Sequence, residues 1–397
     1  MLVKVGHKKS VEIHDDVIRG VLSVYPEEKL ISRPFFEESF ATGTMSFNGL
    51  LKECEAIIIP WQSFFLNPTN FTQQKQNIEK NRSNKLSSKF FAKRSGVGKI
   101  TSKRIIDRLI RLQNFITGSY KLPKNGFCGL LKALKTKDCP KKLTDFFGID
   151  TTKFGSHSAQ MVMKHIIEAV EAKTINVSRG VLRGGILPEV KGVNEVYKNT
   201  SGFVIKDDHI PFIFLPDEIN PDEVIGRRIY TLIYLLVCIG LDDYDFYIES
   251  EFKASALKET GNDSKKHTIV AGILLPVEHT DKLKGAEITK DTISNLASVF
   301  KITPTAVVVT LKRRGVITKH QYEALLPDPY KPQKMPPTPR NPAKITTSVE
   351  KFCGQTAFGL VNTSIKSKTV QSIEAQYLIF GGVKKAKYKE YCKLIGA

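Results

Sequence analysis

The chain of 397 residues lacks any hydrophobic run long enough to cross a bilayer. Its longest apolar stretch, from Leu232 to Leu241, is half the length of a spanning helix, which needs about 20 residues. The N-terminus also lacks the apolar core of a signal peptide, because charged residues soon follow Met1-Leu2-Val3-Lys4. These absences predict a soluble, cytoplasmic protein without a membrane partner.

Cysteine is scarce and scattered along the chain. The six cysteines show no Cys-x-x-Cys spacing, and they are Cys54, Cys128, Cys139, Cys238, Cys353 and Cys392. A zinc ribbon needs paired cysteines, and a disulfide framework needs a denser set. The sequence therefore excludes both classes of protein.

Acidic residues are outnumbered, with 40 Asp and Glu against 60 Lys and Arg and a net charge of +20. The excess is concentrated between Lys75 and Lys124, where fourteen basic residues face only Glu79 and Asp107, a net +12. Such a concentration predicts a polyanionic partner, most simply DNA. The alternative interpretation is a solvated surface without a ligand.

Part of this basic strip has helical order. Ile105, Leu109, Leu112 and Ile116 recur at spacings of three and four residues, which predicts a core-facing helix over residues 100–116. The basic side chains outside that stripe, with those of the loop before it, are the predicted nucleic-acid contacts: Lys85, Lys89, Lys93, Arg94, Lys99, Lys103, Arg104, Arg108 and Arg111.

A second helical segment resembles a zinc-peptidase helix without its ligands. Such a helix needs His-Glu-x-x-His to bind Zn²⁺ and to place a general base. Residues 229–238 read Ile-Tyr-Thr-Leu-Ile-Tyr-Leu-Leu-Val-Cys instead. Before them, residues 201–215 read as two strands joined by an Asp207-Asp208 turn, and after them a segment ends at Ile273-Leu274-Leu275-Pro276.

Further motifs follow in a fixed order. Residues 293–317 read as two helices, with Thr303-Pro304 starting the second and Gly315 ending it. Residues 47–66 and 354–388 read as a leading helical region and as closing helices. In this order the motifs resemble the ImmA/IrrE metallopeptidase family, whose members are associated with helix-turn-helix modules.

The resemblance implies an eroded zinc site. Tyr234 and Cys238 stand at the positions of the two histidines, Leu235 at that of the catalytic glutamate, and Lys265 at that of the third ligand. These four side chains supply neither the zinc ligands of the family nor its general base. We therefore expect no metal, no cofactor and no catalytic residues. A hydrolase with displaced ligands would need Cys238, Asp242 or His267 to meet in space.

The resemblance also implies the fold class and the domains. We expect a mostly helical α+β protein with a zincin-like domain that contains a small sheet, flanked by helical N- and C-terminal regions. The expected parts are a helical region resembling a degenerate repressor-like module (1–70), a basic linker and helix (71–126), the pseudopeptidase domain with its helix-turn-helix segment (127–326), a proline-rich linker (327–345) and C-terminal helices (346–397).

Two functions fit these expectations. The first is a non-enzymatic transcriptional regulator of a phage, another mobile element or a host. It binds nucleic acid through the basic strip and through Lys312, Arg313 and Arg314 of the helix-turn-helix-like segment. The second is a pseudopeptidase that sequesters a repressor or toxin protein without cleaving it. For the segment itself, an ordinary helix pair inside the domain is an equal alternative.

Three further groups are weaker candidates. Arg179, Gly180, Arg183 and Gly184-Gly185 could cradle a phosphate, although the segment lacks a P-loop ending. His157 and His165 stand eight residues apart, without a third metal ligand nearby. Asp242, Asp243, Asp245 and Glu249 could recruit a hard cation, but a solvated turn is the simpler interpretation.

Overall fold

A computed structural model describes residues 1–6, 9–23, 30–57, 61–67, 97–180, 202–216, 225–244, 246–247, 262–327, 344–381 and 385–397, with single residues and pairs between 69 and 85. Helices dominate these residues, and the strands form two small sheets. The predicted α+β class with mostly helical content is confirmed.

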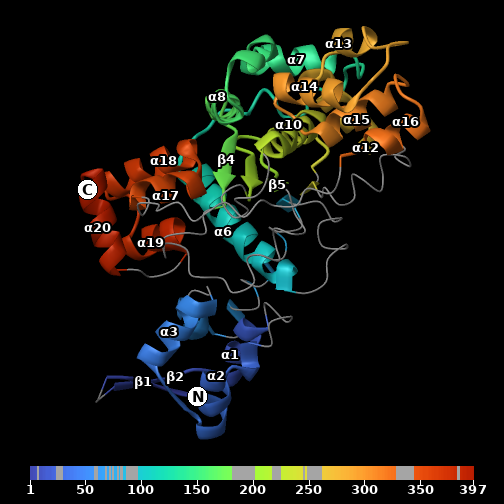
Figure 1. The fold of residues 1–397 in the computed structure, drawn as a ribbon. Helices are drawn as coiled ribbons and strands as arrows, with labels where there is room; N and C mark the ends of the chain where they lie inside the picture. The colour runs from blue at the N-terminus through green and yellow to red at the C-terminus, as the bar shows by residue number, and fades with distance from the viewer. Residues whose placement is uncertain are drawn as a thin grey trace.

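The N-terminal unit contains a sheet that the sequence analysis did not predict. Its elements are β1 (Leu2–Val5), β2 (Lys9–Glu12), α1 (Asp15–Leu22), α2 (Pro34–Thr42), β3 (Thr44–Ser46) and α3 (Phe47–Ile57). Strand β1 pairs antiparallel with β2 and parallel with β3. A separate core forms around Val3, Phe36, Leu50 and Phe64, and this unit lies at the bottom of Figure 1. The N-terminal region, which was expected to be helical, thus combines its helices with three short strands.

The central sheet has the strand order β4-β6-β5-β7. Its strands are β4 (Asn176–Arg179), β5 (Gly202–Ile205), β6 (Phe212–Leu215) and β7 (Phe246–Tyr247). Strands β5 and β6 form the predicted antiparallel hairpin, whereas β4 runs parallel to β6. The hairpin turns at Asp207, whose Oδ1 accepts the backbone N–H groups of His209 and Ile210. This bonding gives the predicted Asp-Asp turn its physical basis.

Alternating side chains of the hairpin face two different cores. Val204 and Ile213 pack into the first core, with α8 (Ala159–Glu171) and α10 (Ile225–Leu241). Phe203, Phe212 and Phe214 pack into the second core, which contains α6 (Val97–Ser119), α17 (Ile345–Cys353), α18 (Gln355–Lys366), α19 (Ser372–Phe380) and α20 (Lys385–Ile395). The sheet is therefore the middle layer between two helical layers (Figure 1).

Six more helices extend the first core. They are α7 (Cys139–Phe147), α12 (Asn262–Leu274), α13 (Val277–Asp281), α14 (Lys290–Phe300), α15 (Pro304–Arg313) and α16 (Lys319–Leu325). Among the described residues no single helix has the length and apolarity to span a membrane; only α14 and α15 taken together pass that test, and they are bent by 106°.

The C-terminal helices dock on the edge strand β4 through side chains. Asn176 donates from Nδ2 to the carbonyl oxygen of Cys353 at 2.6 Å and accepts the Ala357 N–H at 3.1 Å. Between these two residues Gly354 has a φ of +81°, and a Cβ there would lie 2.4 Å from Asn176 Oδ1. The junction between α17 and α18, here called the elbow, thus requires glycine at position 354. The elbow covers the free edge of strand β4.

Candidate functional site

Helix α10, which contains the positions that the resemblance assigns to a zinc motif, is buried at every residue from 229 to 241. Tyr234 is 4% exposed, and Leu235 and Cys238 are fully buried. The helix follows directly from its sequence, since Arg227, Arg228 and Thr231 interrupt a run that is otherwise apolar, aromatic or glycine. Leu235 is an apolar side chain without exposed surface, so it supplies no general base at this position.

The space beside α10 is filled by aromatic and polar side chains from α12. The Tyr230 hydroxyl and His267 Nδ1 share a hydrogen bond of 2.8 Å. The ring centroids of Tyr234 and His267 lie 4.9 Å apart. Burial, with smaller contributions from Arg313 and Lys266, lowers the pKa of His267 to about 3. His267 is therefore a neutral imidazole that accepts or donates one hydrogen bond inside the core.

Lys266 forms a buried ion pair beside this cluster. Its side chain is fully buried, and Nζ lies 2.9 Å from Asp243 Oδ2 and 5.9 Å from the centroid of the Tyr234 ring. An amino group in the interior needs such a partner, because an isolated buried charge is very unfavourable. The pair joins α12 to the turn after α10, where Asp243 lies.

Lys265 does not face the eroded site. It is partly exposed, and its charge acts on the Cys139 thiol of α7, whose pKa is raised mainly by burial. The neighbouring residues Lys266 and His267 face α10 instead. Lys265, which the resemblance places at the third-ligand position, is therefore the sequence neighbour of the residues that contact Tyr234.

No three His, Cys, Asp or Glu side chains form a metal-binding group in the part of the chain that the structure describes. The acidic turn after α10 is occupied by lysines: Asp242 pairs with Lys206 at 3.1 Å and with Lys132 at 3.5 Å. Asp245 and Glu249 lie outside the described residues. Cys238 and His267 lie on the packed helices α10 and α12, where Cys238 is fully buried and His267 is 5% exposed.

The basic strip divides into inward and outward side chains. Arg108 is a correction: it is 8% exposed, donates from Nη2 to the Ile379 carbonyl, and has its guanidinium carbon 3.8 Å from the centroid of the Phe352 ring. Burial lowers its pKa to about 9. Arg108 therefore ties α6 to α17 and α19 and is not available to a phosphate.

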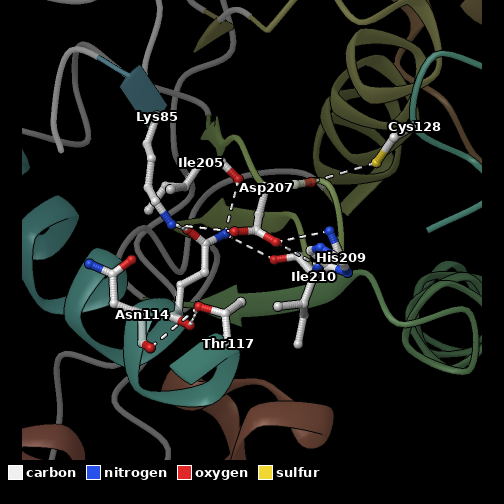
Figure 2. Close-up of polar contacts among 9 residues, drawn as sticks. Lys85, Asn114, Thr117, Cys128, Ile205, Asp207, His209 and Ile210 are labelled. Carbon is white, nitrogen blue, oxygen red and sulfur yellow. Dashed lines mark hydrogen bonds and ion pairs between the residues drawn. The ribbon is translucent and has the colours of Figure 1, made fainter. Parts of the chain in front are cut away.

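Lys85 is also directed inward. Its Nζ donates to Gln113 Oε1 at 2.5 Å and lies 3.4 Å from Asp207 Oδ2, and burial lowers its pKa against the opposing charge of Asp207. Gln113 in turn donates to the carbonyl of Ile210 at 2.9 Å. Figure 2 shows this network, which joins α6 to the turn between β5 and β6.

The remaining members of the strip are exposed or undescribed. Arg111 is exposed on α6, and so are the flanking lysines Lys80, Lys121 and Lys124. Lys99, Lys103 and Arg104 lie on α6, but their side chains are outside the described residues, as are Lys89, Lys93 and Arg94 altogether. Among the described side chains of α6, Arg111 is therefore the exposed basic residue, and it lies beside the uncharged residue Asn114 and the half-buried Asp107.

The helix-turn-helix-like segment has the expected local geometry. Thr303 caps α15 by accepting the Ala306 N–H, Pro304 is its first residue, and α14 and α15 are bent by 106°. That angle lies in the range of helix-turn-helix motifs, about 90–120°. Residues 306–311, however, are all buried. A recognition helix must expose a face to the major groove, so α15 is a core helix.

The three basic residues at the end of α15 are all partly buried, and two of them interact with named side chains or backbone groups. Arg314 donates to Thr280 Oγ1 at 2.9 Å and to the Ala271 carbonyl at 3.1 Å, and burial lowers its pKa. Arg313 acts electrostatically on His267. Lys312 is half-buried. These contacts favour the interpretation of the segment as an ordinary helix pair.

The two other weak candidates have different outcomes. His157 and His165 come together, with ring centroids 5.4 Å apart and an interplanar angle of 88°. Arg179 ends strand β4 and lines a cavity, whereas residues 181–200 lie outside the described part of the chain. The Lys266–Asp243 pair and the buried Gln113 were missed by the sequence analysis, because neither belongs to a motif.

Comparison with known proteins adds no identification. No protein-family model matches the chain, and neither the curated proteins nor the solved structures contain a match. The resemblance to the ImmA/IrrE family therefore depends on the order of motifs alone.

Proposed function

We propose that the chain is a non-enzymatic regulatory protein on a degenerate zinc-peptidase scaffold, and that it binds nucleic acid through the basic strip. The observation that carries this proposal is the net +12 between residues 75 and 124. The packing of α10 supports the non-enzymatic part, since Tyr234, Leu235 and Cys238 are buried among apolar and aromatic neighbours.

The outer face of α6 is the proposed contact surface. Leu109, Leu112 and Ile116 are fully buried in the second core, which orients α6 and leaves Arg111 exposed. Arg104 lies on the same helix, seven residues or about two turns before Arg111. Phosphates contacted along this face release counterions, so the affinity should depend steeply on salt.

The test is fluorescence anisotropy with labelled duplex DNA and with labelled single-stranded RNA over a series of salt concentrations. Charge reversal at Lys103, Arg104 and Arg111 should weaken binding to every sequence. The slope of log affinity against log salt on duplex DNA should fall by about 0.9 for each phosphate that the variant no longer neutralises. Arg108→Met serves as the matched control, since it removes a buried charge of the same helix. It should reduce stability and leave the salt slope unchanged.

Unchanged binding and slope in the charge-reversed protein would remove this face from the interface. Absence of DNA and RNA binding by the unaltered chain, together with a specific complex with a repressor or toxin protein, would instead establish the pseudopeptidase alternative.

A further inference from the structure

A cavity of about 410 Å³ lies on the side of the sheet where four elements meet. Its walls come from α8, from the end of β4, from the first turn of α10 and from the elbow between α17 and α18. Figure 1 shows α8, β4 and α18 side by side in this region. Small-molecule sites typically have volumes of about 300–1,000 Å³, so this cavity has the size of a ligand site.

One side of the cavity is apolar. Met163 and Ile167 stand four residues apart on α8 and are each 7% exposed, and Val177 and Ile225 complete this side. Such a surface would lie against the apolar body of a small molecule rather than against a hydrated ion.

The other side presents cationic groups at the end of β4. Arg179 lines the cavity, and its Nε is buried without a hydrogen-bond partner among the described residues. A buried donor without an acceptor is energetically unfavourable. An anionic acceptor in the cavity would remove this deficit. Arg228, in the first turn of α10, adds a second guanidinium group to the same wall.

Three acidic residues, Glu168, Glu171 and Glu350, also belong to the lining, and Glu171 interacts electrostatically with Arg179. Glu171 accepts the backbone N–H groups of Val177 and Gln355, both on Oε1, and burial raises its pKa to about 7. Near neutral pH a large fraction of Glu171 is uncharged and does not repel an anion. Glu168 pairs with Lys164 at 3.7 Å, so Glu350 is the remaining acidic residue of the lining.

We infer that this cavity binds a small organic anion, whose carboxylate or phosphate group pairs with Arg179 and Arg228 and whose apolar body lies against Met163 and Ile167. The site is distinct from the basic strip and from the eroded zinc positions. In the sequence analysis Arg179 was one of the candidate phosphate contacts.

The experiment is isothermal titration calorimetry on the full chain with three probes: phenyl phosphate, benzoate and the neutral benzyl alcohol. At millimolar concentration at least one of the anions should bind saturably, and benzyl alcohol should not. Arg179→Met should weaken binding at least about tenfold, equivalent to about 1.4 kcal/mol. Lys290→Met, an exposed cation at the start of α14, should leave binding unchanged. Preference for phenyl phosphate or for benzoate would identify the anionic group.

A second variant covers the case in which Arg179→Met does not fold. Met163→Trp fills the cavity from α8 and should weaken binding to a similar extent while Arg179 is retained. The inference is overturned if neither anion binds saturably to the unaltered chain. Equal binding of benzyl alcohol, or undiminished anion binding in both folded variants, would overturn it as well.

Discussion

At the residue scale, burial decides which charged side chains serve structure. Arg108 and Arg111 are three positions apart on α6, yet Arg108 is buried against Phe352 and Arg111 is exposed. The apolar stripe of Leu109 and Leu112 predicts one covered face. It does not predict that α17 and α19, more than 200 residues later in the chain, cover the face of Arg108 as well.

Glu171 gives a prediction about pH. Its folded-state pKa of about 7 is above the ordinary value of 4.5, so the folded chain binds this proton more tightly than the unfolded chain. The contribution of this group to stability is then fully present below pH 4.5 and is lost as the pH rises toward 7. Glu171→Gln keeps an oxygen acceptor for Val177 and Gln355 but cannot ionise.

The variant should therefore gain stability relative to the unaltered chain as the pH rises from 5 to 8, by at most about 3 kcal/mol. Urea unfolding at several pH values measures the difference. Glu168→Gln, an exposed residue on the same helix, should show little pH dependence in the same comparison. A difference between Glu171→Gln and the unaltered chain that does not change with pH would contradict the assigned shift.

At the element scale, local sequence predicts the helices and the hairpin. It does not predict the contacts between elements that are far apart in the chain. The hairpin of β5 and β6 is predictable because a single Asp turn joins two apolar runs. The N-terminal sheet is not, since β1 pairs with β3 about 40 residues later. In α12 the periodicity predicts a helix, but which of Lys265, Lys266 and His267 faces α10 depends on packing between the two helices.

Helix α10 supplies the element-scale prediction. Introducing a His-Glu-x-x-His motif through Tyr234→His, Leu235→Glu and Cys238→His would place polar groups among residues that are at most 4% exposed. Each unpaired buried group should lower the free energy of unfolding by about 1–3 kcal/mol, and Leu235→Glu should be the most severe single change.

Chemical unfolding of the three single variants and the triple variant, with and without Zn²⁺, measures this effect. Tyr234→Phe is the control, because it keeps the ring beside His267. A triple variant as stable as the parent without metal would show that the space around position 235 is open to water.

At the scale of the whole molecule, the cores divide the chain differently from the boundaries expected from composition. The N-terminal core uses residues within 1–66 only. The C-terminal helices, expected as a separate region, share the second core with α6 and with Phe203, Phe212 and Phe214 of the sheet. A hydrogen bond from the Trp61 N–H to the Tyr377 hydroxyl, at 3.4 Å, joins the N-terminal unit to these helices.

Two truncations should consequently behave differently. Removing residues 1–67 should leave the remaining chain folded, with a nearly unchanged thermal transition, because no core is opened. Removing residues 344–397 exposes the three buried phenylalanines of the sheet, each worth about 1.5–3 kcal/mol of burial. The sum approaches the whole stability of a typical domain, about 5–15 kcal/mol. Circular dichroism should therefore show loss of cooperative unfolding, or size-exclusion chromatography should show aggregation, only for the second truncation. A soluble, cooperatively folding chain without residues 344–397 would contradict the shared core.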